Sequence, residues 1–196
     1  MQPRTAPTLA DDPQSRTVLR VVATIPSRRL LRVLGVATAV LVAAGAYVHL
    51  CLYRHGYRTI PKIGVGFLLQ VMGSAIVVLA LLIGPHAVAR VAHVTDGLAG
   101  LLTRVAAAGL AIGTLTAFAL TRTPDGLFDF QERGLQPAPQ ALIALVAEIG
   151  VLVVLGAWLL AYQRARRELR AAAAATRTGA LHVSGGEPHR RSAPRT

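Results

Sequence analysis

Cysteine, acidic residues and aromatic residues are all scarce in this chain of 196 residues. The single cysteine, Cys51, excludes a disulfide framework, a CxxC redox pair and a thiolate metal site. Charged residues make up 15% of the chain, against the ~25% typical of a soluble domain. Walker, Rossmann and nucleophile-elbow motifs are also missing from the sequence, so no catalytic residue is predicted.

Apolar residues, in contrast, are abundant and are concentrated in four long runs. They make up 53% of the chain, and the mean hydropathy is +0.50. The runs cover residues 33–53, 63–83, 98–120 and 141–162. Each is long enough for a helix to cross ~30 Å of hydrocarbon, which takes about 20 residues, and none alternates as a barrel strand does. A soluble bundle would keep a polar face on each helix, so the sequence predicts an all-α bundle of four transmembrane helices.

The distribution of basic residues predicts the orientation of this bundle. Four crossings place both termini on one side, together with the loop at 84–97, and these parts hold 15 of the 21 Lys and Arg residues. The loops at 54–62 and 121–140 hold 5. The positive-inside rule therefore predicts cytoplasmic termini for a multi-pass protein of the plasma membrane, with the two latter loops outside.

Both tails are basic and polar. Residues 1–32 contain four prolines, and we expect a disordered cytoplasmic arm there. In residues 163–196 the sequence predicts a juxtamembrane helix, continued by the alanines at 171–175, and a disordered tail after Thr178. Four arginines directly follow the last crossing: Arg164, Arg166, Arg167 and Arg170. They are expected to face anionic lipids of the inner leaflet, so the net charge of +12 does not predict a nucleic-acid partner.

The two outer loops carry opposite charges. The first has Arg54, Arg58 and Lys62 with no acid, and the second has three acids: Asp125, Asp129 and Glu132. We expect the loops to pair, with Arg54 or Arg58 facing Asp129 or Glu132. Two interpretations remain open, namely a lid that holds the four helices together and a cation-lined entrance to a site.

Polar residues inside the predicted helices lie in the outer half of the membrane. The candidates for ligand binding or proton handling are His49, Gln70, Ser74, Thr114, Thr116 and Glu148. Glu148 matters most because an ionised carboxylate is costly in lipid; it is either protonated or held by His49 or Gln70. Small-residue faces at Gly66 and at Gly109–Gly113 are expected to let the helices approach closely around it.

This cluster is either a polar network that fixes helix register or a pocket for a lipid, quinone or other small molecule. Haem is not predicted, because a bis-histidine site needs two histidines at one depth and only His49 lies within a helix. His86 and His93 lie in the inner loop without a set of metal ligands. The sequence therefore predicts neither a metal nor a cofactor.

The stretch Ala46–Ile83, AYVHLCLYRHGYRTIPKIGVGFLLQVMGSAIVVLALLI, together with GLFDFQE at Gly126–Glu132 and the segment around Glu148, resembles a known group of proteins. This group consists of small four-helix integral membrane proteins of high-GC actinobacteria without an established activity. The resemblance covers residues 33–162 and implies the four-helix fold but no catalytic role. The layout is also distantly similar to DoxX-like membrane proteins, at the level of fold alone.

The functional prediction is a non-enzymatic accessory component of the membrane that binds a lipid or small ligand in the outer polar cluster. The alternative is a proton-coupled small transporter, or a subunit of a redox-linked membrane enzyme, that uses Glu148 and His49. The predicted partners are membrane lipids and either a second copy of the chain or another membrane protein.

Overall fold

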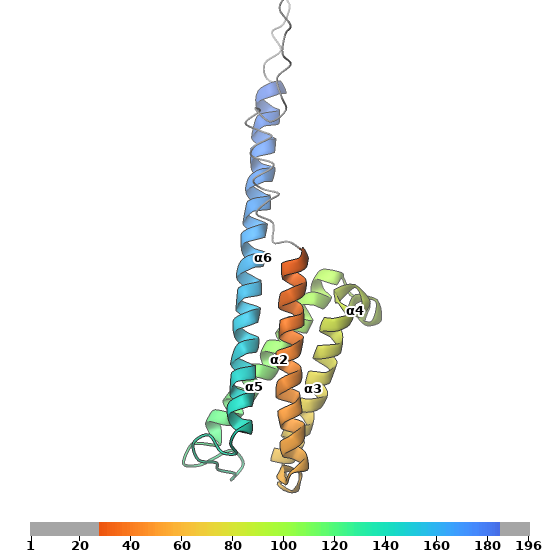
Figure 1. Cartoon of the computed structure of the whole chain (residues 1–196). Helices are drawn as coiled ribbons and strands as arrows, with labels where there is room; N and C mark the ends of the chain where they lie inside the picture. The colour runs from red at the N-terminus through yellow and green to blue at the C-terminus, as the bar shows by residue number, and fades with distance from the viewer. Residues whose placement is uncertain (1–27, 185–196) are drawn as a thin grey trace, which may run out of the picture. The chain divides into compact units, whose positions relative to one another are not determined.

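The computed structural model describes residues 28–184 and is helical through most of that range (Figure 1). Its long helices are α2 (Arg28–Arg54), α3 (Ile63–Ile83), α5 (Asp96–Leu120) and α6 (Gln140–Ser184). Two short elements, the 3-10 turn η2 (Tyr57–Thr59) and helix α4 (Pro85–Ala92), lie between them. In the described residues, β pairing is limited to one isolated bridge between Leu127 and Phe130. The predicted all-α class with four long apolar helices is confirmed.

Local sequence explains where the helices begin and end. Gly84, with φ of 84°, ends α3, and Pro85 then starts α4, where the missing N–H of proline costs nothing. Thr95 caps α5 by accepting a hydrogen bond from the Leu98 N–H at 3.3 Å. Asp96 in the first turn of α5 suits the positive end of the helix dipole.

The helices at the two ends of the described chain are longer than the sequence predicted. α2 begins at Arg28, five residues before the expected start, and so includes the end of the predicted arm. α6 continues past Thr178 to Ser184 because alanine, leucine and arginine all favour helix. The rest of the predicted disordered segments, residues 1–27 and 185–196, lies outside the described residues.

The chain divides into two units, and the first of them, Arg28–Leu159, contains the four-helix bundle. Its central core is formed by small and branched residues from all four long helices: Val42, Val77, Ala107, Ala111 and Val151. In Figure 1, α5 passes behind α2 at a slant while α3 runs beside α2. Of the second unit, the structure describes residues 160–184, which belong to α6.

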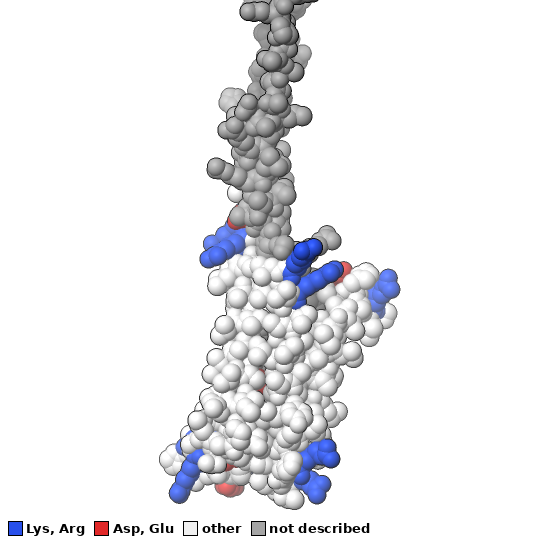
Figure 2. All heavy atoms as spheres, in the orientation of Figure 1, with Lys and Arg blue, Asp and Glu red and all other residues white. Residues whose placement is uncertain are grey.

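The sides of the bundle are apolar and exposed. Branched residues such as Leu69, Ile76 and Val153 are 63%, 68% and 65% exposed. Figure 2 shows a broad belt of the bundle with no lysine or arginine on the face in view. An apolar surface of this extent suits lipid rather than water. Four helices are long and apolar enough to cross a membrane, as expected of a multi-pass integral membrane protein.

Candidate functional site

A cavity of about 300 Å³ lies at the end of the bundle formed by the loops at 54–62 and 121–139. We call it the loop-end cavity. All four long helices and both loops contribute to its lining. Aromatic residues are only 5% of the chain, yet all four of its phenylalanines line this cavity: Phe67, Phe118, Phe128 and Phe130. The only lysine of the chain, Lys62, lines it as well.

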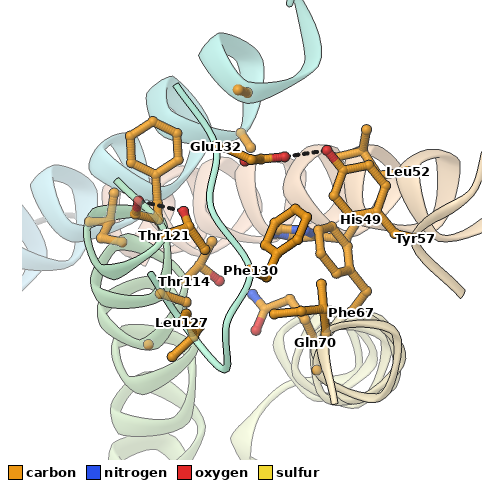
Figure 3. Close-up of a pocket in the computed structure, with 18 of the residues that line it drawn as sticks. His49, Leu52, Tyr57, Phe67, Gln70, Thr114, Thr121, Leu127, Phe130 and Glu132 are labelled. Atoms are coloured by element: carbon orange, nitrogen blue, oxygen red, sulfur yellow. Dashed lines mark hydrogen bonds between the residues drawn. The ribbon is translucent and has the colours of Figure 1, made fainter. Parts of the chain in front are cut away.

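An aromatic wall forms one side of the cavity (Figure 3). The Phe67 ring contacts His49 edge-on, with centroids 5.1 Å apart, and contacts Tyr57 at 5.0 Å. Tyr57 in turn contacts Phe130 at 5.9 Å with the rings nearly perpendicular. Figure 3 shows Thr114 and Leu127 on the side opposite these rings. Because the rings hold one another, the wall presents a fixed apolar surface to anything in the cavity.

Three polar side chains predicted from the sequence meet at the base of the cavity. Glu148 is 3% exposed and His49 is 8% exposed. The Gln70 amide donates a hydrogen bond to Glu148 Oε1 at 3.4 Å, and His49 Nε2 lies 3.8 Å from the same oxygen. Both ring nitrogens of His49 are buried and have no hydrogen-bond partner within the described residues. Since buried polar groups are rarely left unpaired, these nitrogens are available to a ligand or water.

Helix α2 packs directly against the Glu148 carboxylate through a glycine. A Cβ on Gly45 would lie 2.9 Å from Glu148 Oε1, which is closer than two such atoms normally approach. Glu148 lies about 12 Å along α6, eight residues after the first residue of the helix, Gln140. Gly45 thus makes room for the carboxylate well inside the bundle.

The remaining predicted cluster residues separate in the structure. Thr114 lines the cavity, whereas Ser74 is buried below it and Thr116 is exposed on the outside of α5. The predicted small-residue contacts are not found at Gly66, Gly109 and Gly113, where an added Cβ would meet no atom within 4 Å. Gly66 and Gly113 line the cavity instead, so their lack of a side chain makes space for a ligand.

The two loops do meet at the mouth of the cavity, but through other residues than predicted. The Tyr57 hydroxyl donates a hydrogen bond to Glu132 Oε1, and Arg122 Nη2 lies 3.2 Å from Glu132 Oε2. In the part of the chain that the structure describes, neither Arg54 nor Arg58 forms an ion pair with Asp129, Asp125 or Glu132. Arg122 neutralises Glu132 from within the same loop, and the side chains that were expected to pair, Arg54, Arg58 and Asp129, are exposed to solvent.

Lys62 and Phe128 form a second contact between the two loops, with Nζ 5.1 Å from the ring centroid. Phe128 and Asp129 have φ of 55° and 64° at the centre of a tight turn in which the backbones of Leu127 and Phe130 hydrogen-bond to each other. Positive φ is uncommon for a bulky residue such as phenylalanine. The turn places Phe128 and Phe130 together at the cavity mouth, an arrangement that the sequence did not reveal.

Tyr57 is held as a neutral phenol. Burial raises the pKa of Tyr57 above its ordinary value of about 10, and the hydrogen bond to Glu132 raises that pKa further. The hydroxyl therefore stays protonated and donates to Glu132.

The basic residues that follow the last crossing are on α6. Arg164, Arg166, Arg167 and Arg170 are all exposed, and the Arg166 guanidinium lies 5.7 Å from the centroid of the Tyr162 ring. His86 and Asp96 form an exposed pair 3.2 Å apart. Within residues 28–184, no group of three or more His, Cys, Asp and Glu residues could hold a metal ion.

No family model, no curated protein and no solved structure matches this chain. The loop-end cavity and its position in the bundle are the features of the described residues that bear on function.

Proposed function

We propose that this integral membrane protein binds a small, mainly apolar molecule in the loop-end cavity. The observation that carries this proposal is the gathering of all four phenylalanines around one cavity that has a buried polar base. Ligand sites are typically concave, about 300–1,000 Å³ in volume, and mostly apolar with a few converging polar groups. A cavity of about 300 Å³ suits a molecule of one or two rings rather than a whole lipid. The protein acts as a binding component of the membrane and not as an enzyme.

Filling the cavity should abolish binding without disturbing the fold. We expect Gly113→Leu to remove at least about nine tenths of the binding of 4-fluorobenzyl alcohol, a neutral aromatic probe, because the new side chain occupies open cavity space. Gly109→Leu is the matched control, one turn away on α5, also with open space, and outside the cavity lining. Binding is measured by ¹⁹F NMR relaxation of the probe with purified full-length protein in detergent.

The difference between wild type and Gly113→Leu isolates cavity binding from partitioning into detergent. Equal probe relaxation in wild type, Gly113→Leu and Gly109→Leu contradicts the proposal, since only one of the two substitutions reaches the cavity.

Proton-coupled transport is the second candidate, and the pairing of His49 with Glu148 favours it. Their closest atoms are 3.8 Å apart, and intramembrane pairs of this kind hold and pass protons in transporters. Here Glu148→Gln should abolish a proton-driven flux of the ligand into vesicles while the protein still folds. If binding is measured but proton-driven flux is not, the protein binds its ligand without transporting it.

We propose further that the loop-end cavity opens to the outside of the plasma membrane and that both termini are cytoplasmic. The unequal distribution of basic residues supports this orientation, and it would bring Arg164 and its neighbours to anionic lipid. In a Cys51→Ser background, Arg58→Cys should react with an impermeant maleimide on intact cells, and Arg164→Cys only after lysis. The reverse pattern would overturn the orientation.

A further inference from the structure

We infer that the ligand of the loop-end cavity is a small organic cation with an aromatic or apolar body, whose ammonium group binds between Glu148 and the aromatic wall. This inference rests on the proposed binding function and specifies its ligand class. It depends on the acceptors at the base, on the rings around them, and on the absence of a permanent positive charge beside Glu148.

The base of the cavity has more hydrogen-bond acceptors than donors. An ionised carboxylate has about four acceptor positions. Within the described residues, Glu148 accepts one hydrogen bond, the long one from Gln70. His49, whose ring nitrogens have no partner, adds a further acceptor when it is neutral. A ligand that brings N–H donors or a positive charge complements this set, whereas a ligand with only acceptors does not.

The rings beside this base suit a cation. The faces of aromatic rings carry negative charge, and a cation within about 6 Å of a ring centroid is attracted to it. Phe67 contacts His49, which lies 3.8 Å from the Glu148 carboxylate, and Tyr57 contacts Phe67 in the aromatic wall. Figure 3 shows the Phe130 ring and the Gln70 side chain facing the same space. A carboxylate beside several ring faces is the usual chemistry for recognition of substituted ammonium groups.

Fixed positive charges do not neutralise Glu148. The charged or titratable side chains that line the cavity are His49, Tyr57, Lys62, Arg122, Glu132 and Glu148. Arg122 is paired with Glu132 at the mouth, and Lys62 is exposed on the Phe128 ring. The polar groups that α3 and α5 contribute to the lining, such as Gln70 and Thr114, are uncharged. Among residues 28–184, His49 is thus the only residue able to carry a positive charge that is paired with the carboxylate at the base.

These charges determine what happens when a cation binds. A bare carboxylate at membrane depth costs several kcal/mol. An ammonium ion that binds beside Glu148 neutralises this carboxylate, so the site favours a cation over a neutral molecule of the same shape.

Two probes of equal shape test the charge requirement. They are (4-fluorobenzyl)trimethylammonium and its neutral isostere 1-fluoro-4-neopentylbenzene, measured by ¹⁹F NMR with the full-length protein and with Gly113→Leu as the blank. Wild type should bind the cation at least about tenfold more tightly than the isostere. Glu148→Gln should weaken binding of the cation about tenfold or more and leave the isostere unchanged, which also shows that the variant folds.

Lys62→Met tests whether a positive charge at the mouth of the cavity opposes binding of the cation. Removal of this positive charge should strengthen binding of the cation and leave the isostere unaffected, because Lys62 repels cations that approach the cavity. Weaker cation binding in Lys62→Met contradicts the inference.

If neither probe binds wild type more than the Gly113→Leu blank, the proposed function and this inference are both overturned. If the isostere binds and the cation does not, only the cation inference is overturned. Equal affinity for both probes, unchanged by Glu148→Gln, overturns the cation inference but leaves the binding function.

Discussion

Replacement of Gly64 by valine is expected to lower the free energy of unfolding by about 2 kcal/mol or more. Gly64 is buried in the first turn of α3, where the loop at 54–62 passes over it. A Cβ at this position would lie 2.9 Å from the Tyr57 carbonyl oxygen and 3.1 Å from the Arg58 Cα. These are backbone atoms of the 3-10 turn, so they cannot move aside by changing a rotamer. The turn must shift as a whole, and Tyr57 must leave its contacts with Phe67 and Glu132.

Gly66→Val is the matched control for Gly64→Val, because it makes the same substitution two residues later on the same helix. An added Cβ at Gly66 meets nothing within 4 Å. Both variants change helix propensity equally, so the difference between their unfolding midpoints isolates the clash. The midpoints are measured by circular dichroism during thermal unfolding in detergent. Equal midpoints would show that the turn is loosely attached to α3.

The four helices could be predicted because their sequence signals are local. Ile63–Ile83 was predicted to the residue, since Pro61 precedes an uninterrupted apolar run and Gly84 follows it. The ends of α2 and α6 were predicted too short because hydropathy marks where a helix meets lipid and not where it stops. Good helix formers continue the helix past that boundary.

Part of the site could be predicted for the same reason. Depth along each helix follows from 1.5 Å per residue, so His49, Gln70 and Glu148 could all be placed in the outer half of the membrane from their numbers. The direction in which each side chain faces around its helix was harder to predict than its depth. Thr114 and Thr116 are two residues apart, which is about 200° around a helix, so only one of them can face the cavity.

The mouth of the cavity could not be predicted, because its geometry depends on loop backbone. Phe128 and Asp129 adopt positive φ without a glycine to signal it, and that turn alone brings Phe128 to Lys62. The pairing of Arg122 with Glu132 likewise spans ten residues of irregular chain. Charge counting could show that the two loops have opposite sign, but not which arginine bends back toward the acid.

Arg122, which was not among the predicted site residues, connects several parts of the loop at 121–139. Its guanidinium lies 3.4 Å from the centroid of the Phe118 ring and pairs with Glu132. It also donates to the carbonyl oxygens of Gly134 at 2.9 Å, Gln136 at 2.8 Å and Phe118 at 3.0 Å. The side chains of the Arg122–Glu132 pair are 16% and 15% exposed, so the pair is largely removed from solvent.

Arg122→Ala should therefore destabilise the protein by about 2–3 kcal/mol, somewhat less than the loss of a partner from a fully buried pair. It leaves Glu132 without its cation and removes the Arg122 donor from the carbonyls of Gly134 and Gln136, so the amides of residues 123–136 should exchange hydrogen at least about tenfold faster. Arg133→Ala, an exposed arginine of the same loop, should change stability by less than about 0.5 kcal/mol. Arg122→Lys keeps the positive charge but loses the planar guanidinium. Its loss of stability should therefore lie between the losses of Arg122→Ala and Arg133→Ala. Hydrogen exchange followed by mass spectrometry, together with thermal unfolding, measures both effects. Identical behaviour of the alanine variants at 122 and 133 would mean that the loop is held by the Tyr57–Glu132 contact and the Phe128 turn without the arginine.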